Sequence, residues 1–166
     1  MSDLREKVAL VAKGFDGVVA DEDLRGGIAY RSDAASIHGF LKALKEDPAL
    51  KFEMFVYVTA NDNYLDEPRF NVIYQVRSLE NNLDVRVRVP VPGEDPVVPT
   101  MTDLWFAANW MEREVWDMFG IRFEGHPKLE RILMWEGFEG HPLRKEFPLL
   151  GNVRGTPGYV GKGGKR

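Results

Sequence analysis

The chain has 166 residues, of which 44% are hydrophobic and 29% are charged, which is the composition of an ordinary globular protein. It contains no cysteine, so disulfides, thiol catalysis and cysteine-ligated zinc or iron–sulfur sites are excluded in this chain. The net charge of −4 argues against nucleic acid as a partner, and apolar runs such as residues 54–60 are too short to span a membrane. Any membrane association is therefore expected to come through a partner.

The first part of the chain predicts two helices and two short strands. Apolar residues at helical spacing favour a helix over residues 2–15, and short apolar runs favour strands at 18–20 and 28–30. Ser32 is a suitable N-cap for a second helix that continues to Lys45. The face of this helix that we expect to be buried consists of Ala35, Ile37, Phe40, Leu41 and Leu44.

Three longer strands are expected next, at residues 52–59, 70–77 and 83–89. The short turn between the last two predicts a hairpin. In the third strand apolar and polar residues alternate strictly, so one face is predicted to be buried and the arginines opposite to be solvated. The apolar set is Leu83, Val85, Val87 and Val89. A proline-rich loop over residues 90–99 follows.

A third helix is predicted to begin at Thr100 and to end before Gly120, which suits a left-handed C-cap. Arg113 and Asp117 are four residues apart, so they can pair along one face of this helix. Its apolar face is expected to consist of Leu104, Ala108, Met111, Val115 and Met118. The order α-β-β-α-β-β-β-α predicts a two-layer α+β domain over residues 1–119, with a mixed or antiparallel sheet.

Residues 120–166 are expected to form an extended C-terminal segment that binds a partner. Residues 1–119 carry a formal charge of −8, whereas residues 120–166 carry +4. Near its middle, Arg144 and Lys145 stand between apolar anchors that include Phe147. A basic, anchor-bearing stretch attached to an acidic domain is typical of a docking element, because guanidinium groups bind carboxylates and aromatic rings fill pockets.

The segment Phe-Glu-Gly-His-Pro occurs twice, at residues 123–127 and 138–142. One reading is a metal site or acid–base enzyme that uses His126 and His141 together with the helix carboxylates Glu112, Glu114 and Asp117. The other is a pair of bends in which each histidine is a hydrogen-bonding anchor, because glycine permits a tight turn and proline extends the residue before it. The second reading is favoured, since the sequence indicates no pocket around these groups.

The same stretch resembles the 30 kDa subunit family of the proton-pumping NADH–quinone oxidoreductase, respiratory complex I. The resemblance lies in residues 112–149 and is carried by the runs EREVWDMFG, GHP, RIL and GFEGHPLRKEFPL, in that order. Two departures are Glu130, where the family commonly has a basic residue, and Glu146, where an aspartate is usual.

The resemblance implies a non-redox subunit that scaffolds the quinone-reducing module, with FMN, iron–sulfur clusters and quinone held by partner subunits. The implied partners are the hydrogenase-large-subunit-like subunit and the iron–sulfur subunits, at the cytoplasmic face of the plasma membrane. An equivalent subunit of a complex-I-like membrane-bound hydrogenase is the alternative. No catalytic or metal residue is expected. The expected partner-binding residues are Glu112, Arg113, Glu114, Asp117, His126, Arg131, His141, Arg144, Lys145 and Phe147.

Overall fold

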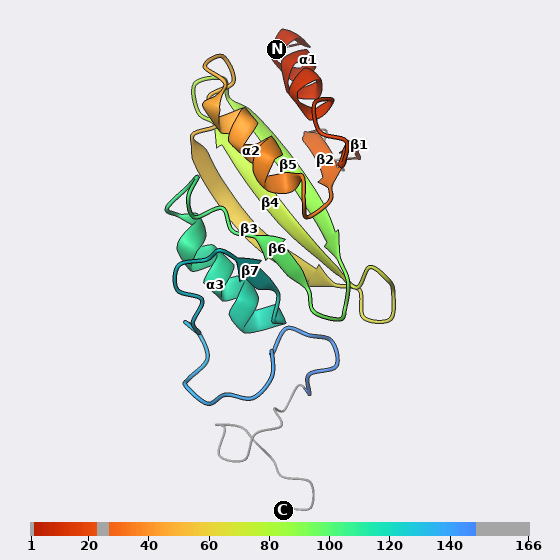
Figure 1. Ribbon diagram of the computed structural model, residues 1–166, viewed down its shortest axis with the longest axis vertical. Helices are drawn as coiled ribbons and strands as arrows, with labels where there is room; N and C mark the ends of the chain where they lie inside the picture. Colours follow the sequence, from red (N-terminus) through yellow and green to blue (C-terminus); the bar gives the residue numbers. More distant parts are fainter. Residues whose placement is uncertain (1, 23–26, 149–166) are drawn as a thin grey trace, which may run out of the picture.

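The computed structural model describes residues 2–22 and 27–148, which form an α+β unit with helices on one face of a five-stranded sheet (Figure 1). The predicted fold class and the order α-β-β-α-β-β-β-α are confirmed, and two further short strands are present. The elements are α1 (Ser2–Ala12), β1 (Val18–Asp21), β2 (Ile28–Ser32), α2 (Ile37–Glu46), β3 (Met54–Asp62), β4 (Phe70–Ser78), β5 (Leu83–Val91), β6 (Val97–Pro99), α3 (Ala108–Phe119) and β7 (Arg122–Glu124).

The sheet is mixed, with strand order β1-β2-β5-β4-β3. Only the β2–β5 pair is parallel within this sheet, and β4 and β5 form the predicted hairpin, with Ser78 opposite Leu83. The four alternating apolar residues of β5 are all buried, as predicted. They share one core with Val8 of α1, Phe40 of α2 and Val115 of α3, so all three helices pack on the same side of the sheet.

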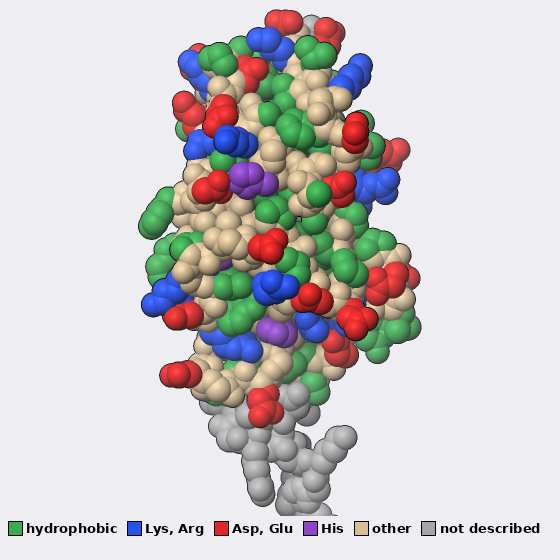
Figure 2. All heavy atoms as spheres, viewed as in Figure 1, with side chains coloured by type: hydrophobic (Ala, Val, Ile, Leu, Met, Phe, Trp, Pro, Cys, Tyr) green, Lys and Arg blue, Asp and Glu red, His purple; other side chains and the backbone are tan. Residues whose placement is uncertain are grey.

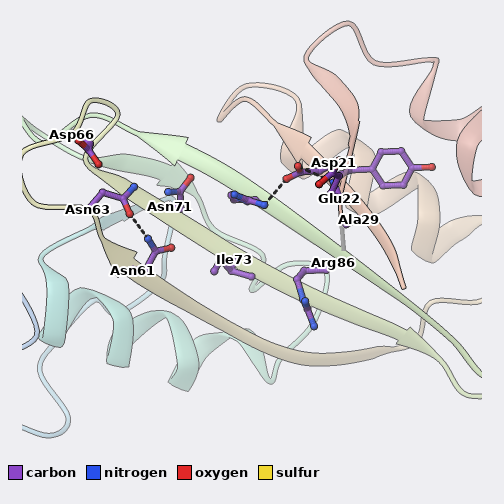
Figure 3. A pocket seen from close by; sticks show the side chains of 11 residues that line it. Asp21, Glu22, Ala29, Asn61, Asn63, Asp66, Asn71, Ile73 and Arg86 are labelled. Atoms are coloured by element: carbon purple, nitrogen blue, oxygen red, sulfur yellow. Dashed lines mark hydrogen bonds and ion pairs between the residues drawn. The ribbon is translucent and has the colours of Figure 1, made fainter. Parts of the chain in front are cut away.

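The opposite face of the sheet is polar. Here Gln75 lies opposite Arg86, Ile73 lies opposite Arg88, and Arg77 pairs with Asp84 at 2.8 Å. A hollow of about 470 Å³ opens on this face and is lined largely by asparagine, arginine and carboxylate side chains (Figure 3). Arg88 closes part of it with an ion pair to Asp21 at 2.8 Å.

Two predicted helix starts were wrong, because the residues chosen as caps belong to strand pairings. Ser32 is the last residue of β2, lies opposite Val18, and is buried. The helix begins at Ile37, so Ala35 lies before it and is exposed. Thr100 continues the β6–β7 pairing through a hydrogen bond from its amide to the Glu124 carbonyl (2.9 Å), and α3 begins eight residues later.

The parallel β6–β7 pair lies where the sequence analysis expected a loop and the start of the extended segment. Ile121 and Phe123 are buried in the main core, so packing continues past the predicted boundary at Phe119. Residues 125–148, called the strap below, contain no helix or strand and run around the C-terminal end of α3 (Figure 1). The predicted C-terminal segment lies outside the described residues from Leu149 onward. Within the described part, no helix is long and apolar enough to cross a membrane.

Candidate functional site

The strap caps the C-terminal end of α3. The last carbonyl groups of a helix have no partner inside the helix and need donors from elsewhere. The Phe119 carbonyl accepts from Nε of Arg144 (2.6 Å), the Met118 carbonyl accepts from the amide of Leu143 (3.0 Å), and Gly120 closes the last turn with φ of 74°. Cationic side chains are favourable here, because the C-terminal end of a helix carries partial negative charge.

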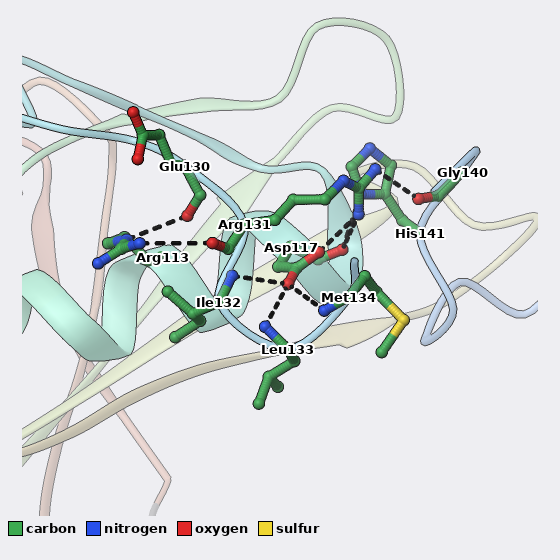
Figure 4. A network of polar contacts seen from close by, with 9 residues as sticks. All are labelled: Arg113, Asp117, Glu130, Arg131, Ile132, Leu133, Met134, Gly140 and His141. Atoms are coloured by element: carbon green, nitrogen blue, oxygen red, sulfur yellow. Dashed lines mark hydrogen bonds and ion pairs between the residues drawn. The ribbon is translucent and has the colours of Figure 1, made fainter. Parts of the chain in front are cut away.

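Asp117 is the centre of this arrangement (Figure 4). Its side chain is fully buried; Oδ1 accepts from Arg131 at 2.5 Å, and Oδ2 accepts from the amides of Ile132, Leu133 and Met134 at 2.8–3.1 Å. Burial by itself raises the pKa of this carboxyl, but these donors outweigh it and the pKa is lowered. Asp117 therefore remains charged and fixes the backbone of residues 132–134 of the strap. Its charged partner is Arg131 rather than the predicted Arg113.

Both copies of the Phe-Glu-Gly-His-Pro repeat place a histidine against a carbonyl of the same helix, the first through Nε2 and the second through Nδ1. A ring nitrogen of His126 lies 3.1 Å from the Asn109 carbonyl, and a ring nitrogen of His141 lies 2.9 Å from the Asp117 carbonyl. In both copies the phenylalanine is buried and the glycine has positive φ. Because Nδ1 of His126 accepts the Lys128 amide (3.0 Å), its proton is on Nε2 and the ring is neutral. Burial lowers the pKa of both histidines.

All three arginines predicted to meet a partner bind the chain itself, Arg131 through Asp117 as described above. Arg113 donates to the carbonyls of Glu130 (3.0 Å) and Arg131 (3.4 Å) and lies against the Trp110 ring. Arg144 lies over the Phe70 ring and reaches the Phe119 carbonyl. Their interactions hold the strap against α3 and the sheet.

The other predicted residues differ in how far their side chains are exposed. Glu112 is fully buried, like Asp117, so it is out of reach of a partner in this conformation. Glu114 and the Lys145 side chain are exposed, and Phe147 is half-buried against Phe138. Contact with a partner remains a prediction for the whole set. Among the residues described, no cluster of three or more His, Cys, Asp or Glu side chains could hold a metal ion.

Large apolar side chains are exposed around α3 and the strap. Phe106 and Trp110 are 83% and 58% exposed, and Leu133, Trp135 and Leu143 of the strap are 45–54% exposed. On the face shown in Figure 2, acidic and basic side chains are interspersed rather than gathered into a patch of one sign. Exposed apolar side chains of this size are typical of surfaces that bind other proteins, so they are a feature with which this region can bind a partner.

Sequence reasoning missed a second anchor of the strap at Asp62 and Arg69. Asp62 is buried at the end of β3, where it accepts from Nη2 of Arg69 (2.8 Å) and from the amide of Lys145 (2.8 Å). Asp62 stands in an Asn-Asp-Asn run that reads as a turn signal, and nothing local connects it to a residue 83 positions later. Only the folded hairpin brings these groups together.

Comparisons with known proteins identify the family of this chain. The sequence model described as "Respiratory-chain NADH dehydrogenase, 30 Kd subunit" matches residues 30–153, which is most of the chain. The chain therefore belongs to the family of the 30 kDa subunit of respiratory-chain NADH dehydrogenase, complex I, and the resemblance noted in the sequence is confirmed. Its bacterial relatives are subunits of NADH-quinone oxidoreductase.

Among these relatives, a NADH-quinone oxidoreductase subunit of Rhizobium meliloti is 49% identical over 138 residues, covering 82% of this chain and 75% of the relative. The corresponding protein of Azorhizobium caulinodans is 41% identical over 151 residues, covering 90% and 71%. Matches to Rhizobium etli and Burkholderia vietnamiensis span only 59% and 60% of those relatives.

Two solved structures share the fold. The trypsin-resistant fragment (1–134) of Nqo5 is 35% identical, with a TM-score of 0.66, and covers 76% of this chain and 99% of the fragment. A chain of the membrane-bound sulfane sulfur reductase, an archaeal respiratory membrane complex, is 26% identical with a TM-score of 0.72 and covers 87% and 85%.

Proposed function

We propose that this chain is a non-redox scaffold subunit of a proton-translocating NADH–quinone oxidoreductase, and that α3 and the strap dock it onto the quinone-reducing module. The observation that carries this proposal is the family match over residues 30–153, which includes α3 and the strap. The strap exposes apolar side chains at Leu133, Trp135 and Leu143, and tryptophan is among the residues that most often dominate the binding energy of an interface.

We propose that other subunits of the complex carry out its redox chemistry. A chain without cysteine offers no thiolate for an iron–sulfur cluster. FMN, the clusters and the quinone are accordingly proposed to belong to partners, and this chain to have no active site of its own. The proposed partners are the hydrogenase-large-subunit-like subunit and the iron–sulfur subunits. Through them the chain is placed peripherally, at the cytoplasmic face of the plasma membrane.

An equivalent role in a related membrane complex is the second candidate. It is supported by the fold shared with a chain of the archaeal sulfane sulfur reductase complex. A stand-alone enzyme built on His126 and His141 has less support, because both rings are engaged with main-chain groups at separate points of α3.

Co-purification tests the proposal. A tagged copy expressed in its native cell should recover the iron–sulfur subunits in near-equal amounts, and the recovered complex should oxidise NADH with a quinone acceptor. NADH-inactive complexes containing hydrogenase-like subunits would favour the second candidate. Recovery of the chain alone from gently solubilised membranes would contradict both candidates.

Leu143→Asp examines the docking surface itself. The leucine is 54% exposed, so a charge there should leave the fold intact but oppose burial against a partner, and the co-purified subunits should fall at least severalfold. Leu79→Asp is the matched control, because Leu79 is 60% exposed in the β4–β5 turn. Equal recovery with both variants would show that the strap surface is not the interface.

A further inference from the structure

We propose that Asp62 acts as a latch that holds the strap on the domain of the isolated subunit, so that the strap is docked before any partner binds. The latch consists of contacts within this chain alone. Its consequence for assembly, that a partner meets a preformed surface, rests on the proposed function.

The latch is a buried carboxylate with four donors. Asp62 is 6% exposed; Oδ1 accepts from Nε of Arg69 (2.9 Å) and from the amide of Tyr64 (2.8 Å). Oδ2 accepts from Nη2 of Arg69 and from the amide of Lys145, both at 2.8 Å. Hydrogen bonds to a charged acceptor are stronger than those between neutral groups, and here both oxygens are fully occupied.

Three of the four donors come from the β3–β4 hairpin, and the fourth is the strap. The guanidinium of Arg69 also pairs with Glu146, so the strap is held on both sides of the Lys145 peptide. Arg69 and Arg144 both lie over the Phe70 ring, at 4.8 and 5.3 Å from its centroid. Asp62 and Glu146 offset part of the repulsion between these two cations, which would otherwise oppose docking of the strap.

The latch sits apart from the helix cap. The cap ties the strap to α3 through residues 131–134, 141, 143 and 144, whereas Asp62 ties the next residue to the sheet. Phe147 then stacks on Phe138, at 5.7 Å between ring centroids, and closes the strap on itself. The strap is thus fixed both to α3 and to the β3–β4 hairpin, which β5 and β6 separate from α3 along the chain.

Hydrogen exchange of the isolated full chain tests the latch. In the wild type, the amides of Leu143, Lys145 and Phe147 should be protected, because they donate to the Met118 carbonyl, Asp62 and the Arg144 carbonyl. In Asp62→Asn, either orientation of the amide turns an N–H toward an existing donor. Exchange of the Lys145 amide should then rise on the order of tenfold or more, the scale of one charge-assisted hydrogen bond, while amides in β4 and β5 keep their protection.

Asp95→Asn is the matched control, because it removes the exposed Arg122–Asp95 pair (3.3 Å) and should leave strap exchange unchanged. Glu146→Gln is the second variant should Asp62→Asn fail to fold. It removes only the Arg69–Glu146 ion pair, so the exchange rates of the same amides should rise by less. Wild-type strap amides that exchange as fast as an unstructured peptide would overturn the proposal. So would unchanged strap protection in the folded Asp62→Asn or Glu146→Gln variant.

Discussion

Glu112 shows how a single side chain can carry the pH dependence of this fold. It is fully buried and accepts from the hydroxyl of Thr100 (2.5 Å) and the amide of Met101 (2.6 Å). Burial raises its pKa to about 7, and these two donors lower it only in part. The carboxyl thus fixes the segment before α3 to the helix, and its charged form is penalised by the surrounding core.

The raised pKa of Glu112 makes the stability of the fold depend on pH. The folded protein holds the Glu112 proton up to a pH of about 7, whereas the unfolded chain releases it near 4.5. The stability contribution is therefore complete below 4.5 and is lost as the pH rises toward 7, by about 3 kcal/mol at 1.36 kcal/mol per pKa unit. Glu112→Gln cannot ionise, so its unfolding free energy minus that of the wild type should rise over this window.

Urea unfolding of both proteins at a series of pH values measures that difference. Comparing the two proteins cancels the titration of other groups, including Asp117, whose lowered pKa has the opposite effect at acid pH. A difference that stays constant between pH values of about 4.5 and 8 would show that Glu112 has an ordinary pKa in the folded state.

At the scale of elements, sequence patterns predicted the features that depend on residues close together along the chain. The alternation in β5 is visible because side chains of a strand point to opposite faces at every step. The C-cap at Gly120 could also be predicted, since a position with left-handed backbone favours glycine. Thr100 was misread because its hydroxyl, which looks like a helix cap, donates to Glu112 twelve residues later.

Predictions about the candidate site had the same limit. The residues of α3 and the strap were identified, and the repeat correctly indicated histidines that act as hydrogen-bonding anchors. The partner of Asp117 could not be predicted from the sequence. Helical spacing suggests Arg113, whereas in the folded chain the strap residue Arg131 donates to Asp117. The Asp62 anchor depends on a contact between residues 62 and 145, for which the sequence holds no periodic signal.

The junction between α3 and the strap can be tested with two glycines. Gly120 and Gly137 both have positive φ, 74° and 83°, so alanine should cost about 1–2 kcal/mol at either position. A Cβ at Gly120 would also lie 2.5 Å from Nε2 of His141 and 2.6 Å from Nη2 of Arg144, whereas a Cβ at Gly137 would meet nothing within 4 Å. Gly120→Ala should therefore destabilise by a further ~1–3 kcal/mol, as overpacking does.

Thermal and urea unfolding of both variants give the comparison, with Gly137→Ala as the control for backbone strain alone. Equal losses of stability in the two variants would mean that His141 and Arg144 move aside freely, and that the strap is not tightly packed at the helix end.

At the scale of the whole molecule, the hydrophobic core continues past α3 into β7. Ile121 and Phe123 are 0% and 2% exposed, and β7 pairs with β6. A chain that ends after Phe119 loses both side chains, roughly 2–5 kcal/mol each, which is comparable to the total stability of a domain. It should not unfold cooperatively, whereas a chain that ends after Glu124 should.

Circular dichroism during urea unfolding distinguishes the two truncated chains. The longer one lacks the strap, so its α3 carbonyls lose their caps and its midpoint should lie below that of the full chain. If the chain ending at Phe119 unfolds as sharply as the one ending at Glu124, then β7 contributes little and the boundary predicted from the sequence is correct.

The contacts of His126 and His141 with α3 also determine where residues can be inserted or deleted. The carbonyls that they reach, at Asn109 and Asp117, are eight residues apart on α3, about 12 Å along the axis at 1.5 Å per residue. One inserted residue between them would rotate the second carbonyl by about 100° away from its histidine. An insertion at the exposed Gly137 bend leaves both attachment points where they are, so natural length variation should be found there and be absent from α3.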